Sequence, residues 1–334
     1  MKYCRHIAAG RKNFRGIYFS LTFKEGYVII FKKEGEKMFE VYLPGTGGMK
    51  PLPDRFLTGL WAEHEGRALL IDCGEGMQVA LAKISRSLAK LDMLLITHFH
   101  ADHIAGLPGL LLSAGNFGKT SPLKIYAPEG GAAVIRNICC ICGGLPFPLE
   151  IHEITGGSFL WEDIEINAMP VRHRVKTLCY SLTEHRKAVF DPEKAKAAGV
   201  PMSLWKTLHS GNTAEADGRI FTPEMVTEGK RRPLKVTYIT DTVYFEGLAT
   251  FAKGSDLLVS EGMYGSDEYR ESMNDKQHML FSDSAKIAKL SGSGELWLTH
   301  YSPALTEPAD FEGDVKMLFE NTVVSRDGIH KTIK

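Results

Sequence analysis

Three histidines and an aspartate stand within six residues, in the stretch ITHFHADHIAGLPGLL at 96–111. An apolar run that predicts a strand precedes them, and an apolar run that predicts a helix follows at once. Imidazole nitrogens and carboxylate oxygens are the ligands that zinc and similar divalent ions take in proteins. A chance cluster of this kind at a strand end is improbable. The predicted metal ligands of this stretch are therefore His98, His100, Asp102 and His103.

The spacing of these ligands predicts two neighbouring ions. On an extended loop, the first two histidines can hold one ion while Asp102 and His103 hold the second. One loop cannot complete two sites, so the remaining ligands must come from other strand ends. Three candidates stand in such places: His173 after IEINAMPV, Asp241 after LKVTYIT, and His300 at the end of ELWLTH. A carboxylate at 241 can bridge both ions.

A pair of ions predicts hydrolysis. Two divalent ions about 3.5–4 Å apart share a water, lower its pKa from about 15.7 toward 7, and stabilise charge on a phosphoryl oxygen. No Ser-His-Asp elbow competes with this interpretation. The glycine-rich segment GTGG (45–48) lacks the Lys-Ser/Thr that follows the glycines of a phosphate-binding P-loop.

Ten short apolar or alternating runs predict strands, with helical patterns between many of them. The runs cover 39–43, 68–72, 93–97, 123–127, 149–154, 164–171, 177–183, 234–240, 256–262 and 295–300. The pattern indicates α/β layers with a mixed sheet. One predicted helix, SDSAKIAKLSG, begins with Ser282 as a candidate N-cap.

Two stretches differ from this alternation within a chain of 334 residues. Residues 1–38 predict a hairpin, since RGIYFSLTF and GYVIIFKK flank a Lys-Glu-Gly turn. Residues 184–233 carry short helical pieces without a core-strand pattern, which indicates an insertion or arm on one compact domain. Both stretches are basic. They would suit an anionic ligand, although solvated surfaces explain such charge as often.

Composition excludes several classes of protein. The net charge is zero, so bulk charge names no partner, and 44% hydrophobic residues suffice for a large core. The six cysteines do not form the framework of a small secreted domain. A charged N-terminus without an apolar core indicates no signal peptide, and no apolar run is long enough to span a membrane. We therefore expect a cytoplasmic enzyme.

The ligand pattern HxHxDH with its distant His, Asp and His partners resembles the metallo-β-lactamase superfamily. Within it, the chain resembles the ribonuclease Z family of tRNA 3′-processing endonucleases over about residues 39–334. The segments that carry this resemblance are LPGTGGMKPLPDR (43–55), LLIDCGEGMQ (69–78), HFHADHIAGLPGLL, VRH (171–173), ITDT (239–242) and LTHYS (298–302). The resemblance implies a four-layer αββα sandwich with two mixed sheets. It also implies two divalent ions, Zn²⁺ with Mn²⁺ as the alternative, and removal of 3′ trailers from pre-tRNA.

The resemblance also implies three catalytic roles. Asp102 would orient or deprotonate the attacking water, and His278, polarised by Glu261, would donate a proton to the departing 3′ oxygen. His278 lies 22 residues before the last ligand, as the family pattern requires. The chain departs from the family pattern at Ser260, Met279–Leu280, Ala304–Leu305 and Met202–Ser203.

In the family the arm grips the tRNA elbow and often reaches toward a dimer partner. The resemblance therefore implies RNA as the partner, a homodimer, and phosphate contacts from Lys194, Lys196, Lys206, Arg231 and Arg232. Two alternatives stay open. The same chemistry could act on a small phosphodiester such as a cyclic nucleotide, or the chain could bind metal and act only through RNA or protein contacts.

Overall fold

The computed structural model describes residues 39–186, 188–229 and 231–334, together with four two-residue strands nearer the N-terminus. These four strands pair antiparallel: β1 (Phe19–Ser20) with β4 (Phe31–Lys32), and β2 (Phe23–Lys24) with β3 (Tyr27–Val28). The rest of the hairpin predicted in residues 1–38 lies outside the described residues, so the hairpin stays a prediction.

Two seven-stranded sheets form the centre of the molecule. In spatial order the first sheet consists of β10 (Leu149–Ile154), β9 (Leu123–Pro128), β8 (Leu91–Leu95), β7 (Arg67–Ile71), β6 (Leu60–His64), β5 (Phe39–Tyr42) and β20 (His330–Ile333). The second consists of β11 (Gly157–Trp161), β12 (Ile164–Pro170), β13 (Leu178–Glu184), β16 (Leu234–Ile239), β17 (Leu257–Glu261), β18 (Leu296–Thr299) and β19 (Thr322–Val324). Both sheets are mixed, because β7 to β10 and β16 to β19 run parallel while the other pairs run antiparallel.

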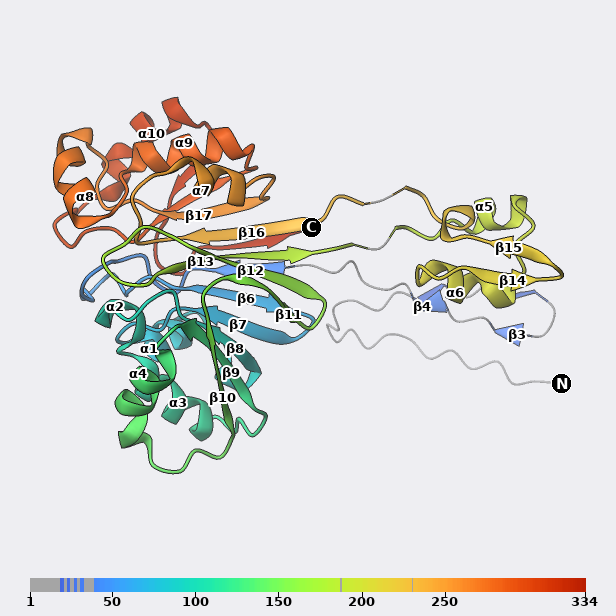
Figure 1. Ribbon diagram of the computed structural model, residues 1–334, viewed down its shortest axis with the longest axis horizontal. Coiled ribbons are helices and arrows are strands. Elements are labelled where there is room, and N and C mark those ends of the chain that lie inside the picture. The colour runs from blue at the N-terminus through green and yellow to red at the C-terminus, as the bar shows by residue number, and fades with distance from the viewer. Residues whose placement is uncertain are drawn as a thin grey trace, which may run out of the picture.

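Helices cover the outer faces of the sheets (Figure 1). Those on the first sheet are α1 (Met77–Lys83), α2 (Ala101–Ile104), α3 (Leu107–Asn116) and α4 (Gly131–Ile138). Those on the second are α7 (Glu246–Phe251), α8 (Arg270–Lys276), α9 (Phe281–Ser291) and α10 (Glu312–Leu318). Short 3-10 turns cover Leu88–Lys90, Cys139–Cys142, Met202–Leu204, Pro223–Met225, Asp267–Tyr269 and Pro308–Phe311. The four layers are those predicted.

The core follows the alternation of side chains along the strands. In β8, Met93 and Leu95 are buried between the two sheets, while Leu94 packs under the helices of the first sheet. In β12, Ile164 and Ile166 enter the same inter-sheet layer from the second sheet. A strand that is buried on both faces has an uninterrupted apolar sequence, and the run MLLI in and just after β8 is an example.

All ten predicted strands are present, with ends shifted by at most two residues. The predicted N-cap Ser282 is wrong, because Ser282 lies inside α9, which begins at Phe281 and has Leu280 as its N-cap. The backbone N–H of Leu280 donates a hydrogen bond to the Asp283 carboxylate at 3.0 Å. The capping side chain at this end of α9 is therefore Asp283 and not Ser282.

Residues 184–233, which we call the arm, run from the last residue of β13 to the start of β16 and project away from the sandwich (Figure 1). They contain α5 (Pro192–Ala197), α6 (Trp205–His209) and an antiparallel hairpin of β14 (Ala214–Ala216) and β15 (Arg219–Phe221). Buried apolar side chains give the arm a small core of its own, formed by Ala195, Val200, Leu208, Phe221 and Val226. The sequence analysis predicted the helices here but missed the hairpin.

Candidate metal centre

The predicted ligands meet at one end of the sandwich. Strands β8, β12, β16 and β18 all deliver their C-terminal ends there, and loops beyond the carboxyl ends of strands are where such sheets place their sites. One detail of the prediction is wrong. Asp102 and His103 do not lie on an extended loop but in the single turn of α2, whose N-cap residue is His100.

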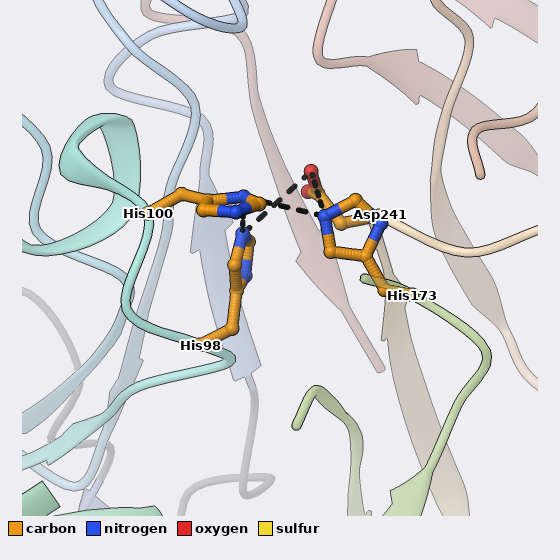
Figure 2. Close-up of side chains that lie close together, drawn as sticks. All are labelled: His98, His100, His173 and Asp241. Atoms are coloured by element: carbon orange, nitrogen blue, oxygen red, sulfur yellow. Dashed lines mark hydrogen bonds and ion pairs between the residues drawn. The ribbon is translucent and has the colours of Figure 1, made fainter. Parts of the chain in front are cut away.

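One group of ligands consists of His98, His100, His173 and Asp241, whose ligand atoms lie within 4.8 Å of one another (Figure 2). His100 Nδ1 lies 2.9 Å from His98 Nε2 and 3.3 Å from His173 Nε2. Asp241 Oδ1 lies 3.8 Å from His98 Nε2 and 3.9 Å from His173 Nε2. Atoms that share one ion, each about 2.0–2.2 Å from it, can be at most about 4.4 Å apart. These four residues therefore fit a divalent ion.

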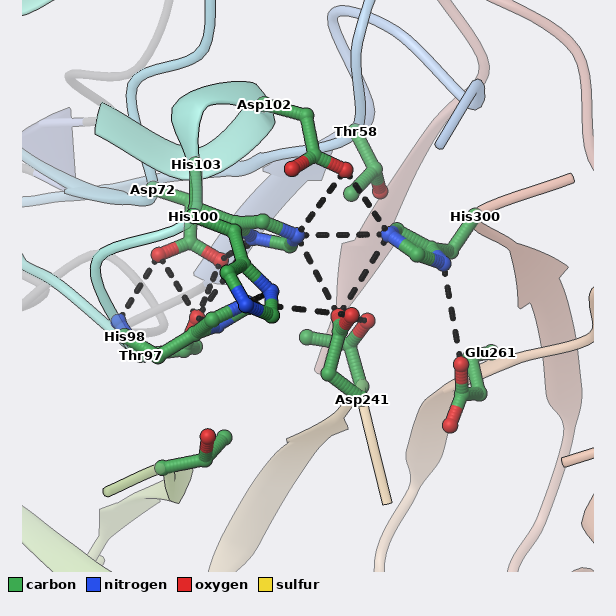
Figure 3. A network of polar contacts seen from close by, with 12 residues as sticks. Thr58, Asp72, Thr97, His98, His100, Asp102, His103, Asp241, Glu261 and His300 are labelled. Atoms are coloured by element: carbon green, nitrogen blue, oxygen red, sulfur yellow. Dashed lines mark hydrogen bonds and ion pairs between the residues drawn. The ribbon is translucent and has the colours of Figure 1, made fainter. Parts of the chain in front are cut away.

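A second group consists of Asp102, His103 and His300 (Figure 3). The two Nε2 atoms lie 3.2 Å apart, and Asp102 Oδ2 lies 3.5 Å from His103 and 3.4 Å from His300. Asp241 Oδ2 lies 3.2 and 3.4 Å from the same two nitrogens. Asp241 thus turns one oxygen to each group, which is the geometry of a bridging carboxylate.

The charge states of the buried histidines and carboxylates also indicate a bound cation. Burial holds the pKa of His98, His100 and His173 below the usual range, so their rings keep a neutral nitrogen for a ligand bond. Burial alone would lower the pKa of His103, but the carboxylates of Asp241 and Asp72 raise it well above the ordinary value. Buried carboxylates need a compensating charge. The ligand types and their spacing suit a divalent cation in that role.

Residues behind the ligands hold them in place. Asp72 is fully buried, lies 2.8 Å from His103 Nδ1, and accepts hydrogen bonds from the N–H and hydroxyl of Thr97. Such contacts fix the orientation of a ligating imidazole. The sequence analysis gave Asp72 no role, although a carboxylate directly after the buried strand β7 was a usable signal.

The glycine-rich segment GTGG also supports the centre. The backbone N–H of Met49 donates to Asp102 Oδ2 at 2.7 Å. Gly48 lies against the ring of His300, where a Cβ would come within 2.8 Å of ring carbon Cε1. The segment therefore needs glycine for close packing against a ligand and not for binding phosphate.

Asp72, Asp241 and His300 have left-handed backbones, with φ of 64°, 55° and 61°. Asp72 and His300 directly follow a strand and Asp241 lies two residues after one, and each turns its side chain toward the centre at that point. Non-glycine residues rarely adopt this conformation, and it is concentrated at functional sites.

His278 and Glu261 form a pair at the edge of the centre. His278 Nδ1 lies 2.9 Å from Glu261 Oε2, while Glu261 Oε1 accepts the N–H groups of Thr242 and Met279. Burial alone would lower the pKa of His278, but the Glu261 carboxylate raises it to about 9. A ring held by Glu261 through Nδ1 can donate a proton from Nε2. Ser260 is buried and bonds to the Ser284 hydroxyl instead of facing the ligands.

The predicted RNA-binding cations lie elsewhere. The six residues of β16 separate the arm from Asp241, a span of about 20 Å. Lys194 Nζ donates to Thr227 O, Lys196 pairs with Glu193, and Arg232 pairs with Asp256. Lys206 is exposed and Arg231 is half-buried, and neither has a side-chain partner among the described residues.

Comparison with known proteins supplies the family. The chain is 42% identical to a ribonuclease Z of Clostridium acetobutylicum over 298 residues, which is 87% of this chain and 96% of that protein. It is also 42% identical to a ribonuclease Z of Lachnoclostridium phytofermentans over 292 residues, with the same two shares. The chain belongs to the ribonuclease Z family. As a member of the ribonuclease Z family, it is a metal-dependent hydrolase.

Other matches agree with the ribonuclease Z fold. A family model described as anti-Pycsar protein Apyc1 matches residues 39–197, just under half of the chain. The short form of human tRNase Z matches with a TM-score of 0.63 and 22% identity, covering 88% of this chain and 99% of that one. The metallo-β-lactamase fold protein YhfI of Bacillus subtilis matches with a TM-score of 0.65 and 19% identity, covering 89% and 100%. The fold is therefore the predicted metallo-β-lactamase fold.

Among the helices of the described residues, none has both the length and the apolar character that crossing a bilayer requires.

Proposed function

We propose that this protein is an endoribonuclease that removes 3′ trailers from pre-tRNA by hydrolysing the phosphodiester after the discriminator base. One observation carries the proposal. Two ligand groups share Asp241 and lie beside the His278–Glu261 pair, in a chain 42% identical to proteins named ribonuclease Z. A hydrolase for phosphodiesters needs both parts, since one stabilises charge on the phosphate and the other protonates the leaving oxygen.

The proposal assigns two divalent ions to the centre. His98, His100, His173 and Asp241 would hold one of them. Asp102, His103 and His300 would hold the other, with Asp241 shared. Zn²⁺ suits this set of nitrogen and oxygen ligands, and Mn²⁺ is the alternative. When bound, such a pair lowers the pKa of a water and stabilises negative charge on a phosphoryl oxygen.

The protein side chains would orient the reactants and move protons. Asp102, held by the Met49 N–H, would accept the proton of the attacking water. The water oxygen bonds to phosphorus while the bond from phosphorus to the 3′ oxygen breaks. His278, held by Glu261, would donate its proton to that oxygen. The products are a tRNA with a 3′-hydroxyl and a trailer with a 5′-phosphate.

The arm has a separate role in this proposal. Its cations, Lys206 and Arg231 above all, would contact phosphates of the folded tRNA far from the scissile bond. Such contacts do not depend on base sequence and weaken as salt rises. We also propose the homodimer and the cytoplasmic location that the sequence analysis expected. Light scattering of the purified protein tests the first, and a mass of one 37.0 kDa chain would contradict it.

The decisive experiment compares two classes of substrate. Purified protein is incubated with 3′-extended pre-tRNA and, separately, with cyclic nucleotides, and the RNA ends are mapped. We expect a single cut after the discriminator base that leaves a 3′-hydroxyl. Rapid hydrolysis of cyclic nucleotides without cleavage of pre-tRNA would overturn the proposal and leave only the metal centre.

A further inference from the structure

A cavity of about 470 Å³ lies beside the metal centre, and we call it the side pocket. One wall is formed by the loop 171–177 between β12 and β13 of the second sheet and by the strand residue at each end of it. The facing wall comes from the ends of β9 and β10 of the first sheet, at 128–129 and 154–155. His173 lines the pocket and also belongs to the first ligand group, so the pocket and the metal centre share a wall.

The walls combine apolar surface with positive charge. Pro128, Ile154 and Val175 supply apolar surface, and the side chains of Arg174 and Lys176 stand on the same loop as Val175. Arg174 Nη2 donates to Asp275 O at 3.0 Å and is exposed. A purely apolar ligand would leave the two cations unused, and a bare anion would leave the apolar walls in contact with water. A nucleotide offers both a flat base and a phosphate.

Building on the proposed function, we propose that the side pocket binds the first nucleotide of the 3′ trailer. Its base packs against Val175 and Ile154, and the phosphate on its 3′ side contacts Lys176 and Arg174. The shared residue His173 places this nucleotide directly next to the scissile phosphate.

The position of the proton donor decides which side of the scissile bond enters the pocket. The leaving 3′ oxygen belongs to the upstream nucleotide and must face His278. His173 contacts the ring of His278, at a centroid distance of 5.1 Å, and also lines the side pocket, whereas His278 does not line it, so the ring of His173 stands between the proton donor and the pocket. The phosphorus stays with the downstream nucleotide, which is the first of the trailer. The pocket on the His173 side is therefore assigned to that nucleotide.

An ion pair crosses the pocket before substrate binds. Lys176 Nζ lies 2.5 Å from Glu129 Oε2, which joins the wall on the second sheet to the wall on the first. Both side chains are more than half exposed, at 67% and 59%. Exposed pairs of this kind are weak, so a phosphate can take the place of Glu129.

A double cycle, in which the substrate loses a base and the enzyme carries one substitution, tests the base contact. Pre-tRNA is prepared with an intact or an abasic first trailer nucleotide, and each is cleaved by the wild type and by Val175→Asp. For the wild type we expect kcat/KM to fall roughly tenfold when the base is absent, as stacked bases contribute on this scale. The substitution Val175→Asp should lower kcat/KM by a similar factor on the intact substrate. It should change kcat/KM little on the abasic substrate, because the contact with the base is already absent there.

The control is Leu160→Asp, which places the same charge on an exposed apolar residue of β11 outside the pocket. It should cleave both substrates like the wild type. Metal content and Tm of Val175→Asp establish that this variant is folded. The abasic substrate tests the wild type directly, so the proposal can fail even if the variant does not fold.

The phosphate contact has its own measurement. Lys176→Ala should reduce the slope of log kcat/KM against log salt by about 1, the value of one phosphate contact. Glu129→Gln should lower KM, since Lys176 no longer has to leave its partner. Lys316→Ala is the matched control, because Lys316 lies 2.5 Å from Glu312 in a similar exposed pair on α10. That variant should leave the salt slope unchanged.

Two results would overturn this inference and leave the proposed function intact. One is equal cleavage of intact and abasic substrates by the wild type. The other is an equal loss on both substrates in Val175→Asp. By contrast, no cleavage of intact pre-tRNA by the wild type would show that the proposed function itself is wrong.

Discussion

The metal centre and the arm are built in opposite ways. At the centre, ligands from separate strand ends lie within 4 Å of one another, and several are almost fully buried; His98, His103 and Asp241 are examples. In the arm, five buried apolar residues form a small separate core, and cations such as Lys206 lie on the surface. The centre depends on the whole sandwich, whereas the arm is joined to it by the chain that enters and leaves at β13 and β16 and by contacts close to that chain, such as the ion pair of Arg232 with Asp256.

Under the proposed function, the centre supplies the chemistry and the arm supplies affinity for tRNA, so the two can be altered separately. A change at the centre should affect every phosphodiester, since every substrate needs the same ligands. A change in the arm should affect only substrates large enough to reach it.

The largest effect is expected from the shared carboxylate. Asp241→Asn replaces one of the two carboxylate oxygens that face the two ligand groups, so metal content should fall below two ions per chain. Cleavage of pre-tRNA and of a small model diester should both fall to background. Elemental analysis and both assays check this, with Asp54→Asn on the exposed surface as control. A wild type that binds one ion or none after metal loading would contradict the dinuclear centre.

The next effect concerns the proton donor. His278→Ala should lower pre-tRNA turnover about 10²-fold or more, the usual contribution of general acid catalysis, with metal content unchanged. An activated ester with a good leaving group needs little protonation, so its hydrolysis should suffer less. Equal losses on both substrates would exclude His278 from this role.

Removal of the arm should separate the two functions most clearly. The Glu228 N–H donates to Val189 O at 2.9 Å, so a two-residue turn can replace residues 190–227 without straining the sandwich. KM for pre-tRNA should rise severely while hydrolysis of the small diester stays nearly intact. If both activities fall together, the arm acts as a lid or supports the dimer and does not grip tRNA.

The smallest effect is expected from a cavity in the arm core. Leu208→Ala truncates a fully buried residue and should loosen only the arm, detected by hydrogen exchange there with little change in sandwich Tm. The matched Leu258→Ala in β17 should cost about 2–5 kcal/mol of sandwich stability. A common Tm loss in both variants would show that arm and sandwich unfold together.

The residues that meet at the candidate centre could be found from the sequence because their signal is concentrated. His98 to His103 lie close together in the chain, and His173, Asp241 and His300 each follow a strand that is visible as an apolar run. The arm hairpin was missed because β14 and β15 have three residues each, too few for a periodic signal. Its turn, Asp217–Gly218 with φ of 50° and 72°, was the available clue, since Asp-Gly favours tight hairpins.

Contacts between distant backbone groups could not be read from the sequence. The Met49 N–H reaches Asp102 across 53 positions, and the Gln277 carbonyl lies 3.1 Å from His173 Nδ1 across 104. The residue type at these positions does not predict such a contact, because almost every residue has the same backbone N–H and C=O. The side pocket was hidden for the same reason, as its walls come from two sheets.

The left-handed backbone at Asp241 has a consequence for directed evolution. A non-glycine residue pays about 1–2 kcal/mol for this conformation, and here it also buries a carboxylate. Asp241→Gly would relieve both costs in the metal-free chain. A laboratory screen for heat resistance alone would therefore enrich variants that are catalytically inactive. Each round of such a screen must include a selection for activity.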